Sequence, residues 1–296
     1  MGYLYLLLQA LIFSFGGILI KLTSASFSPF MVSFLRFALG VLLLLLIQLI
    51  RGGKPQIRLA DRMILFGGLA KALHYLGENY GVMHGFSYGN VVIWPVQTVV
   101  ILLISTLILK EKVTRRAIAG AFLCVSGIVL LTWNGMPPKQ FIGGQGLLLI
   151  AFVLAGIGAS LFSVAQKKLL NKMDTVSLNN SMFIIGSFCT AGILPATGGA
   201  VSGMRLSAVA AMLALGVITG TGFLLQAEAL KTVPIFTATV VQSSTVLLSL
   251  LWAAILYRET ISGYAIAGTL LFLAGIICVN LRAQGAQTTQ SKGGTT

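Results

Sequence analysis

Long apolar runs, separated by short polar junctions, follow one another along nearly the whole chain. A window of about 19 residues separates ten runs, each long enough to cross a bilayer as a helix. They lie near residues 3–23, 30–50, 62–83, 88–109, 116–133, 146–166, 178–196, 207–229, 235–256 and 262–281. Glycine and proline mark the junctions, as in Arg-Gly-Gly-Lys-Pro at 51–55. This pattern predicts an all-α integral membrane protein with ten transmembrane helices.

The two halves of the chain share a local pattern at an offset of 148 residues. Ala-Ile-Ala-Gly occurs at 117–120 and at 265–268, each time after an apolar run that ends at a glutamate, Glu111 or Glu259. Each half holds five predicted spans, and an odd number reverses the direction in which the second half enters the membrane. We therefore expect two inverted five-helix repeats. Their bounds are 1–137 and 138–283, and a polar, disordered cytoplasmic tail follows at 284–296.

Composition supports a membrane protein and argues against a soluble one, because only 9% of the residues are charged and 57% are apolar. The net charge of +14 comes mainly from basic residues in the junctions. No basic helix face of the kind that grips nucleic acid is present, so we expect no nucleic-acid partner. With a cytoplasmic N-terminus, fourteen basic residues fall inside and three outside, Lys139, Arg205 and Arg258. This bias predicts a cytoplasmic-membrane protein with both termini in the cytoplasm.

The third span carries an unusual set of ionisable residues, Lys71, His74 and Glu78, with Asn79 and Tyr80 alongside. At 100° per residue the three ionisable groups lie within an arc of about 60° on one helix face. Such groups cost about 2.5–3.5 kcal/mol each within a membrane and usually face an aqueous cavity. We expect this face to line a central cavity that binds substrate or a proton. The alternative is a buried Lys71–Glu78 pair that only fixes helix packing.

Other polar residues at membrane depth are weaker candidates for the same cavity. The offset of 148 places Gln226 opposite Glu78. In the fourth span Trp94 and Gln97 flank Pro95, whose missing N–H can expose a backbone carbonyl to a cavity. Arg36 and Lys21 also lie within spans, where long side chains can reach the membrane surface or a site. Glycines such as Gly16 and Gly216 are expected at close helix crossings.

One catalytic motif is matched by its residues but not by the structure that it requires. Gly85-Phe86-Ser87-Tyr88-Gly89 matches the nucleophile elbow, but that elbow requires a strand, a turn and a helix, with a histidine and an acid in place. An intramembrane serine hydrolase using Ser87 is therefore kept only as an alternative. The chain has no phosphate-binding loop, dinucleotide fingerprint or metalloprotease motif. Its three cysteines show no metal-ligand spacing, so they are expected to be buried free thiols. We expect no catalysis, no cofactor and no metal.

The doubled endings at Glu111 and Glu259, and Ser-Pro-Phe at 28–30 followed by Arg36, resemble EamA-type members of the drug/metabolite transporter superfamily. The second half departs from this pattern, with Asp174-Thr175-Val176 in place of Ser-Pro-Phe and Met182 near the position of Arg36. A role for Arg36 is therefore not carried over to the second half.

The resemblance implies a secondary transporter that moves a small metabolite across the cytoplasmic membrane by alternating access, commonly for export. Amino acids, nucleobases or nucleosides, and organic cations all remain open as substrates. A proton is one option for the coupling ion, and both a monomer and a homodimer remain open. A membrane scaffold that transports nothing is the alternative from another functional class.

Overall fold

The computed structural model describes residues 1–52, 56–85, 89–108, 115–133, 135, 137–197, 201–257 and 262–280. Within these ranges all regular elements are helices, apart from an isolated bridge between Phe27 and Val201. The helices are α1 (Gly2–Ser14), α2 (Gly16–Thr23), α3 (Pro29–Ile50), α4 (Arg62–His84), α5 (Ile93–Leu107), α6 (Arg115–Trp133), α7 (Pro138–Leu169), α8 (Thr175–Ile193), α9 (Leu206–Leu230), α10 (Ile235–Gln242), α11 (Thr245–Tyr257) and α12 (Gly263–Asn280), with the 3-10 turns η1 (Gly89–Val92) and η2 (Leu194–Thr197). Glu111, Glu259, Ser87 and the tail lie outside the described residues.

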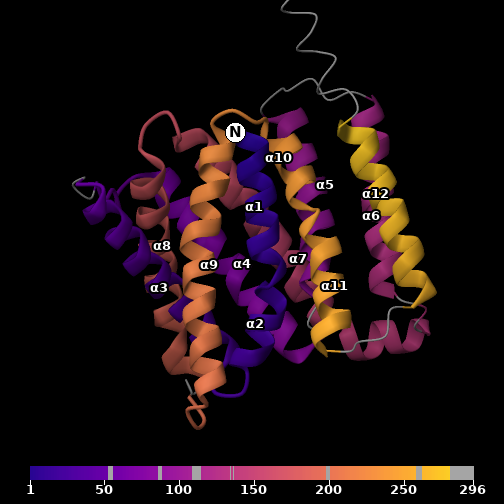
Figure 1. Cartoon of the computed structure of the whole chain (residues 1–296), viewed down its shortest axis with the longest axis horizontal. Helices are drawn as coiled ribbons and strands as arrows, with labels where there is room; N and C mark the ends of the chain where they lie inside the picture. The colour runs from indigo at the N-terminus through magenta and orange to yellow at the C-terminus, as the bar shows by residue number, and fades with distance from the viewer. Residues whose placement is uncertain are drawn as a thin grey trace, which may run out of the picture.

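The long helices stand side by side in one bundle, with α3 and α8 on one flank and the packed pair α6 and α12 on the other (Figure 1). Six helical segments of the described chain are long and apolar enough to cross a membrane, and three shorter helices are also apolar. This composition and length confirm the predicted all-helical membrane protein. The polar helix α4 lies inside the bundle, packed against α7 and α8.

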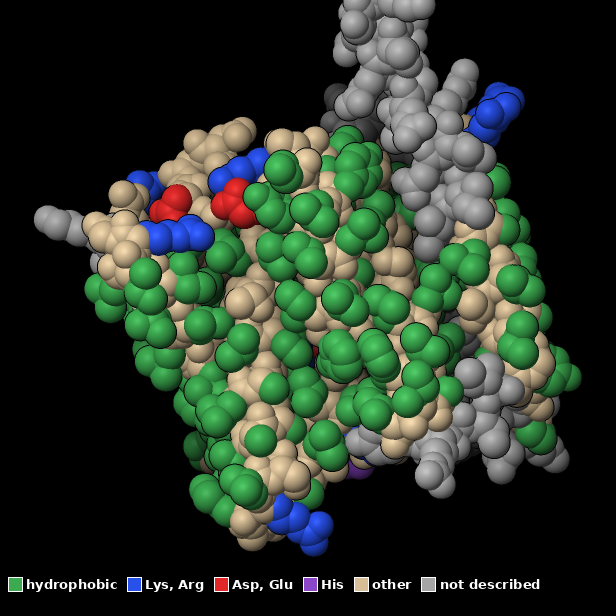
Figure 2. All heavy atoms as spheres, viewed as in Figure 1, with side chains coloured by type: hydrophobic (Ala, Val, Ile, Leu, Met, Phe, Trp, Pro, Cys, Tyr) green, Lys and Arg blue, Asp and Glu red, His purple; other side chains and the backbone are tan. Residues whose placement is uncertain are grey.

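Apolar side chains cover the flank of the bundle seen in Figure 2, while charged side chains gather at its two ends. Phe122 on α6 and Phe188 on α8 are each 70% exposed, as expected of side chains that face lipid rather than a protein core. Arg51 and the Glu228–Lys231 ion pair lie at the end where the chain begins, since Gly2 approaches Thr232. The structure thus has an apolar belt between two polar caps.

Two of the predicted spans are interrupted helices. The span 3–23 divides at Phe15 into α1 and α2, and the span 235–256 divides at Ser243 and Ser244 into α10 and α11. Serine hydroxyls at both breaks donate to backbone carbonyls of the preceding turn, Ser14 to Leu11 and Ser243 to Thr239. Such bonds compete with the helical ladder and bend helices.

The fourth and sixth spans begin close to the predicted residues, but their first turns differ from a simple spanning helix. The fourth starts as the 3-10 turn η1, so Pro95 lies in the first turn of α5, where its missing N–H costs no helical hydrogen bond. The sixth apolar span begins at Gly146, as predicted, whereas its helix α7 already begins at Pro138, inside the junction expected at 134–145, because proline favours the first position of a helix. All three cysteines are free, but only Cys124 is buried; Cys278 is exposed on α12, contrary to expectation.

Glycines bring specific helices into backbone contact. A side chain at Gly158 of α7 would meet the carbonyl oxygen of Ala70 at 2.5 Å and the amide nitrogen of His74 at 2.7 Å, both on α4. Gly216 of α9 is equally crowded by Leu39 of α3, as the sequence predicted. Gly16 has nothing within 4 Å, so its expected role in a close crossing is wrong. It lines a cavity instead.

Two lysines bind the carbonyl ends of helices at opposite ends of the bundle. Lys21 of α2 donates to the carbonyls of Val82, Met83 and Gly85, at 3.2, 3.1 and 2.5 Å, where α4 ends. Lys167 of α7 donates to the carbonyls of Leu230 and Val233, where α9 ends. A cation at a helix C-terminus satisfies carbonyls that have no helical partner and complements the helix dipole.

Candidate functional site

A cavity with an empty volume of about 570 Å³, including its opening, lies within the bundle. It is lined from both halves of the chain, by α1 to α5 with η1 on one side and by α7, α9 and α10 on the other. Its polar lining residues are Arg36, Lys71, His74, Tyr75, Glu78, Asn90, Trp94, Gln97, Ser163, Gln226 and Gln242. Phe13, Phe162 and Phe223 are among its apolar lining residues.

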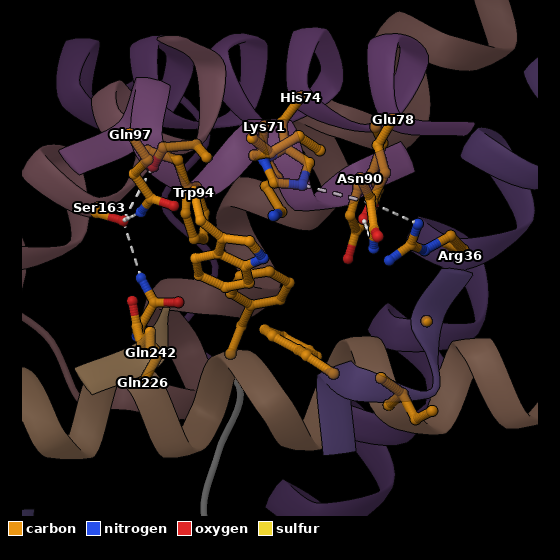
Figure 3. Close-up of a pocket in the computed structure, with 18 residues that line it drawn as sticks. Arg36, Lys71, His74, Glu78, Asn90, Trp94, Gln97, Ser163, Gln226 and Gln242 are labelled. Carbon is orange, nitrogen blue, oxygen red and sulfur yellow. Dashed lines mark hydrogen bonds and ion pairs between the residues drawn. The ribbon is translucent and has the colours of Figure 1, made fainter. Parts of the chain in front are cut away.

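One end of the cavity is charged (Figure 3). Arg36 of α3 donates to Glu78 of α4 at 2.8 Å, and both side chains are buried. His74 lies one helical turn before Glu78, with its Nε2 3.5 Å from the same carboxylate oxygen. Asn90 of η1 reaches the other oxygen, Oε1, at 3.5 Å. Three side chains from three elements thus converge on the carboxylate of Glu78.

Asn79 holds the arginine of this cluster in place. Its amide oxygen accepts from Arg36 at 2.9 Å, and its amide nitrogen donates to Ser33 of α3 at 2.8 Å. The guanidinium also lies over the ring of Tyr75, 3.7 Å from its centroid, and its Nε donates to Thr219 of α9 at 3.4 Å. Arg36 therefore joins α3, α4 and α9 through a buried network, a geometry that suits its planar, multidentate donor group.

The other end of the cavity is a row of neutral amides and hydroxyls (Figure 3). Ser163 of α7 accepts from Gln226 of α9 at 2.9 Å and from Gln97 of α5 at 3.4 Å. Gln9 of α1 donates to Gln226 at 2.9 Å and accepts from Gln242 of α10 at 2.7 Å. This chain of hydrogen bonds connects five helices. Amide groups that both donate and accept can exchange partners with a polar ligand.

Lys71 and Trp94 lie between these two ends (Figure 3). The side chain of Lys71 is 0% exposed, and its ammonium lies over the rings of Phe223, Tyr75 and Phe162 at 3.6, 4.4 and 5.0 Å from their centroids. No ion pair joins it to Glu78, since that acid binds Arg36 and His74 among the described residues. The alternative of a Lys71–Glu78 packing pair therefore does not describe this arrangement.

Seven of the nine residues singled out from the sequence line this one cavity: Arg36, Lys71, His74, Glu78, Trp94, Gln97 and Gln226. Asn79 lies behind the cavity wall as the partner of Arg36. Tyr80 points elsewhere, with its ring stacked on His84 at 4.3 Å. Ser87, on which a hydrolase would depend, lies outside the described residues.

The sequence analysis did not identify the aromatic wall of the cavity, which is formed by Phe13, Tyr75, Phe162 and Phe223. It also did not identify Ser163 and Gln242 of the amide row. Tyr75 and Phe223 stand 148 residues apart, as do Trp94 and Gln242, so the repeat offset could have paired them. Ser163 had no comparable signal, because small hydroxyl residues are common in membrane helices and often bond only their own backbone. Its hydroxyl does donate to the carbonyl of Ala159 at 2.9 Å while accepting from the glutamines.

Comparison with known proteins agrees with the fold. An uncharacterized transporter of Archaeoglobus fulgidus is 24% identical over 266 residues, covering 88% of this chain and 91% of its own length. A crystal structure described only as that of a protein aligns with a TM-score of 0.77 at 17% identity, covering 96% of this chain and 98% of its own. The sequence model described as the EamA-like transporter family matches twice, at residues 1–133 and 146–281. This chain therefore belongs to the EamA-like transporter family and is a membrane transporter.

Proposed function

We propose that this transporter moves a small polar metabolite across the cytoplasmic membrane by alternating access, with the cavity as its substrate site. The observation that carries the proposal is a polar cavity at membrane depth, lined from both halves of the chain. Lys71 and His74 stand near the middle of α4 (Arg62–His84), where ionisable groups are costly unless a function retains them. The cavity combines apolar and aromatic walls with a few polar groups, as small-molecule sites do.

The two halves are proposed to be inverted five-helix repeats with ten spans in all. Support comes from the two matches of the family model and from the lysine caps. Lys21 and Lys167 stand 146 residues apart, and the carbonyls that they bind, Val82 and Leu230, stand 148 apart. Equivalent contacts at opposite ends of a bundle are what an inverted repeat produces. Binding at the interface of such repeats allows the cavity to open to either side in turn.

Both termini are proposed to be cytoplasmic, and the direction of transport to be export. The end of the bundle where α1 begins carries Arg51 and Lys231, and Lys167 caps α9 at the same end. Positively charged junctions favour the cytoplasmic side. Export is the direction that the family resemblance implies.

A proton is proposed as the coupling ion, exchanged within the cluster of His74, Glu78 and Arg36. Support comes from the position of this cluster, buried at membrane depth and lining the substrate cavity. Groups that share one buried site titrate as a unit, so a substrate that enters beside them changes their protonation together. A substrate flux that does not change with an imposed pH gradient would contradict proton coupling.

Reconstituted proteoliposomes test the function directly. Flux of amino acids, nucleobases, nucleosides and organic cations is measured with and without an imposed pH gradient. We expect saturable flux of at least one class and a large loss in Trp94→Ala, which removes an indole from the cavity wall. Phe188→Ala is the matched control, because Phe188 faces outward. Absence of flux for every class would contradict the proposed function.

A further inference from the structure

The ammonium group of Lys71 has no hydrogen-bond acceptor among the described residues, although it is completely buried. An ammonium carries three N–H donors, and a buried charge without partners is strongly unfavourable. The rings of Phe223, Tyr75 and Phe162 attract the cation but cannot accept three ordinary hydrogen bonds. The side chain also lines the cavity, so a ligand can supply what the protein does not.

The charges that line the cavity do not balance. Its described cations are Arg36 and Lys71, and its acid is Glu78, which binds Arg36 at 2.8 Å. His74 directs its Nε2 toward the same acid, 3.5 Å away. When Lys71 is protonated, one positive charge is therefore left over. A ligand that carries a single negative charge would neutralise the cavity.

The groups around Lys71 indicate what the rest of such a ligand would contact. Trp94 lies beside the lysine, between the charged cluster and the amide row (Figure 3). Asn90 has a buried side-chain oxygen without a donor, and Nδ1 of His74 also lacks a partner. Aromatic walls accept an apolar or planar body, whereas these free polar atoms accept neutral donors and acceptors.

We propose that Lys71 is an anion-binding subsite and that the substrate is a small organic monoanion bound through its carboxylate. This inference rests on the proposed function and names the substrate class for that site. The carboxylate replaces the missing acceptor of Lys71, and the body of the molecule lies against Trp94 and the aromatic wall. A dianion such as phosphate leaves the cavity negative, and an organic cation leaves it doubly positive.

Acid and amide pairs test this assignment on the purified full-length protein. Acetate, benzoate and indole-3-acetate are each compared with the corresponding primary amide, and inorganic phosphate is added as a separate arm. We expect at least one carboxylate to raise the melting temperature in a concentration-dependent way, because a ligand stabilises the state that it binds. The matched amide and phosphate should give no shift. No shift with any carboxylate, or an equal shift with its amide, would overturn the proposal.

Variants then assign the effect to one side chain. Lys71→Met should lose the carboxylate shift, Lys71→Arg should keep most of it, and Lys172→Met, on an exposed lysine, should leave it unchanged. An undiminished shift in Lys71→Met would overturn the assignment. If Lys71→Met does not fold, the comparison of acids with amides on the wild-type protein still decides the outcome.

Flux measurements separate this inference from the proposed function. Carboxylate binding without transport of any compound would refute the transport mechanism and leave the subsite in place. Transport of a neutral or cationic metabolite, with no carboxylate binding, would refute the subsite and leave the transport mechanism in place. Transport of a carboxylate that Lys71→Met abolishes is the result expected if both are right.

Discussion

Arg36 shows how a charged side chain is accommodated at membrane depth. Its guanidinium is shared between Glu78, Asn79 and Thr219, and its face lies over Tyr75. Spreading the donors over several acceptors offsets the loss of water, which a single ion pair does poorly. The arginine is thus both part of the cavity wall and the link that joins α3 to α4 and α9.

Glu78→Gln should destabilise the protein more than the loss of one hydrogen bond would. Removing one partner of a buried pair leaves the other charge uncompensated, at a cost of about 3–5 kcal/mol. The double variant Arg36→Gln, Glu78→Gln removes both charges of the pair, so we expect it to be more stable than Glu78→Gln alone. Both should lose transport. Thermal unfolding of the two single variants and the double variant measures the coupling.

Glu228→Gln is the control for this cycle, because Glu228 forms a half-exposed pair with Lys231 at the end of α9. Exposed ion pairs contribute about 0–1 kcal/mol to stability, so the melting temperature of Glu228→Gln should differ little from that of the wild type. Strictly additive effects of Arg36→Gln and Glu78→Gln would contradict the buried network described above.

Spacing along one helix was enough to predict that Lys71, His74 and Glu78 share a face. The partners of these residues could not be predicted in the same way, because Arg36 reaches Glu78 across 42 positions of the chain. A sequence pattern shows which residues share an element but not which face meets which neighbour. For that reason a Lys71–Glu78 pair stood as the alternative to a cavity-lining face, whereas the structure gives the acid to Arg36 and surrounds the lysine with rings.

At the scale of the helices, the crossing of α4 and α7 depends on glycine at Gly158. Gly158→Ala would place a methyl group against the backbone of Ala70 and His74, atoms that cannot move aside without moving the helix. We expect the free energy of unfolding to fall by about 1–3 kcal/mol. Transport should also be reduced, because Lys71 and His74 lie on the displaced turns. Melting temperature and flux measure both effects.

Gly146→Ala is the matched control on the same helix, since nothing lies within 4 Å of the added carbon. Alanine favours the helix by roughly 0.5–1 kcal/mol over glycine, so this variant should be as stable as the wild type or more so. Equal destabilisation at both positions would show that the effect is not steric.

The first turn of α8 depends on Asp174, whose carboxylate accepts from the amides of Val176 and Ser177, each at 3.0 Å. Partial burial alone would raise the pKa of Asp174, but the hydrogen bonds from Ser177 and Val176 outweigh it and lower the pKa below its ordinary value. The folded state therefore prefers the ionised form. Its stabilising effect is complete above the unfolded pKa of about 3.9 and is lost as the pH falls through the lower folded value.

Asp174→Asn keeps the capping geometry and removes the charge. The wild type should be more stable than this variant near neutral pH, by about 0.3–1 kcal/mol for a charge at a helix N-terminus. The difference should shrink when the pH is lowered below about 4. Thermal unfolding as a function of pH provides the measurement, and a difference that is constant with pH would contradict the assignment.

Hydropathy located the helices well but could not find their interruptions. An averaging window sees the apolar content of 3–23 and 235–256, and both segments are strongly apolar on average. The breaks come from serine hydroxyls that bond the backbone, Ser14 in one helix and Ser243 in the other. Each side chain adds little to the hydropathy average, although it changes the direction of a helix.

At the scale of the whole molecule, the proposed topology makes a prediction about access. After Cys124, Cys189 and Cys278 are replaced by serine, Lys172→Cys and Ser202→Cys place single thiols at exposed positions on opposite ends of the bundle. An impermeant maleimide should label Ser202→Cys in intact cells, and Lys172→Cys only after permeabilisation. Labelling of Lys172→Cys in intact cells would reverse the orientation.

In the proposed alternating-access cycle, the two lysine caps would allow one end of the cavity to open independently of the other. Helices α1 and α2 pack on α9, α4 packs on α7, and the cavity lies between these two groups. Lys21 joins the two groups at one end and Lys167 joins them at the other. Moving α2 away from α4 breaks the bonds of Lys21, each worth about 1.5–3 kcal/mol when the donor is charged.

Opening both ends at once would cost both sets of bonds, so a doubly open state, which would leak, would be the rarest. Lys21→Met should therefore raise the fraction of molecules open at the end where α4 finishes, and Lys167→Met should raise the fraction open at the opposite end. Thiol accessibility of Gly16→Cys, at the cavity wall, measures this shift from either side. In the proposed alternating-access cycle, a lysine that caps a helix would thus also set which end of the cavity opens more readily.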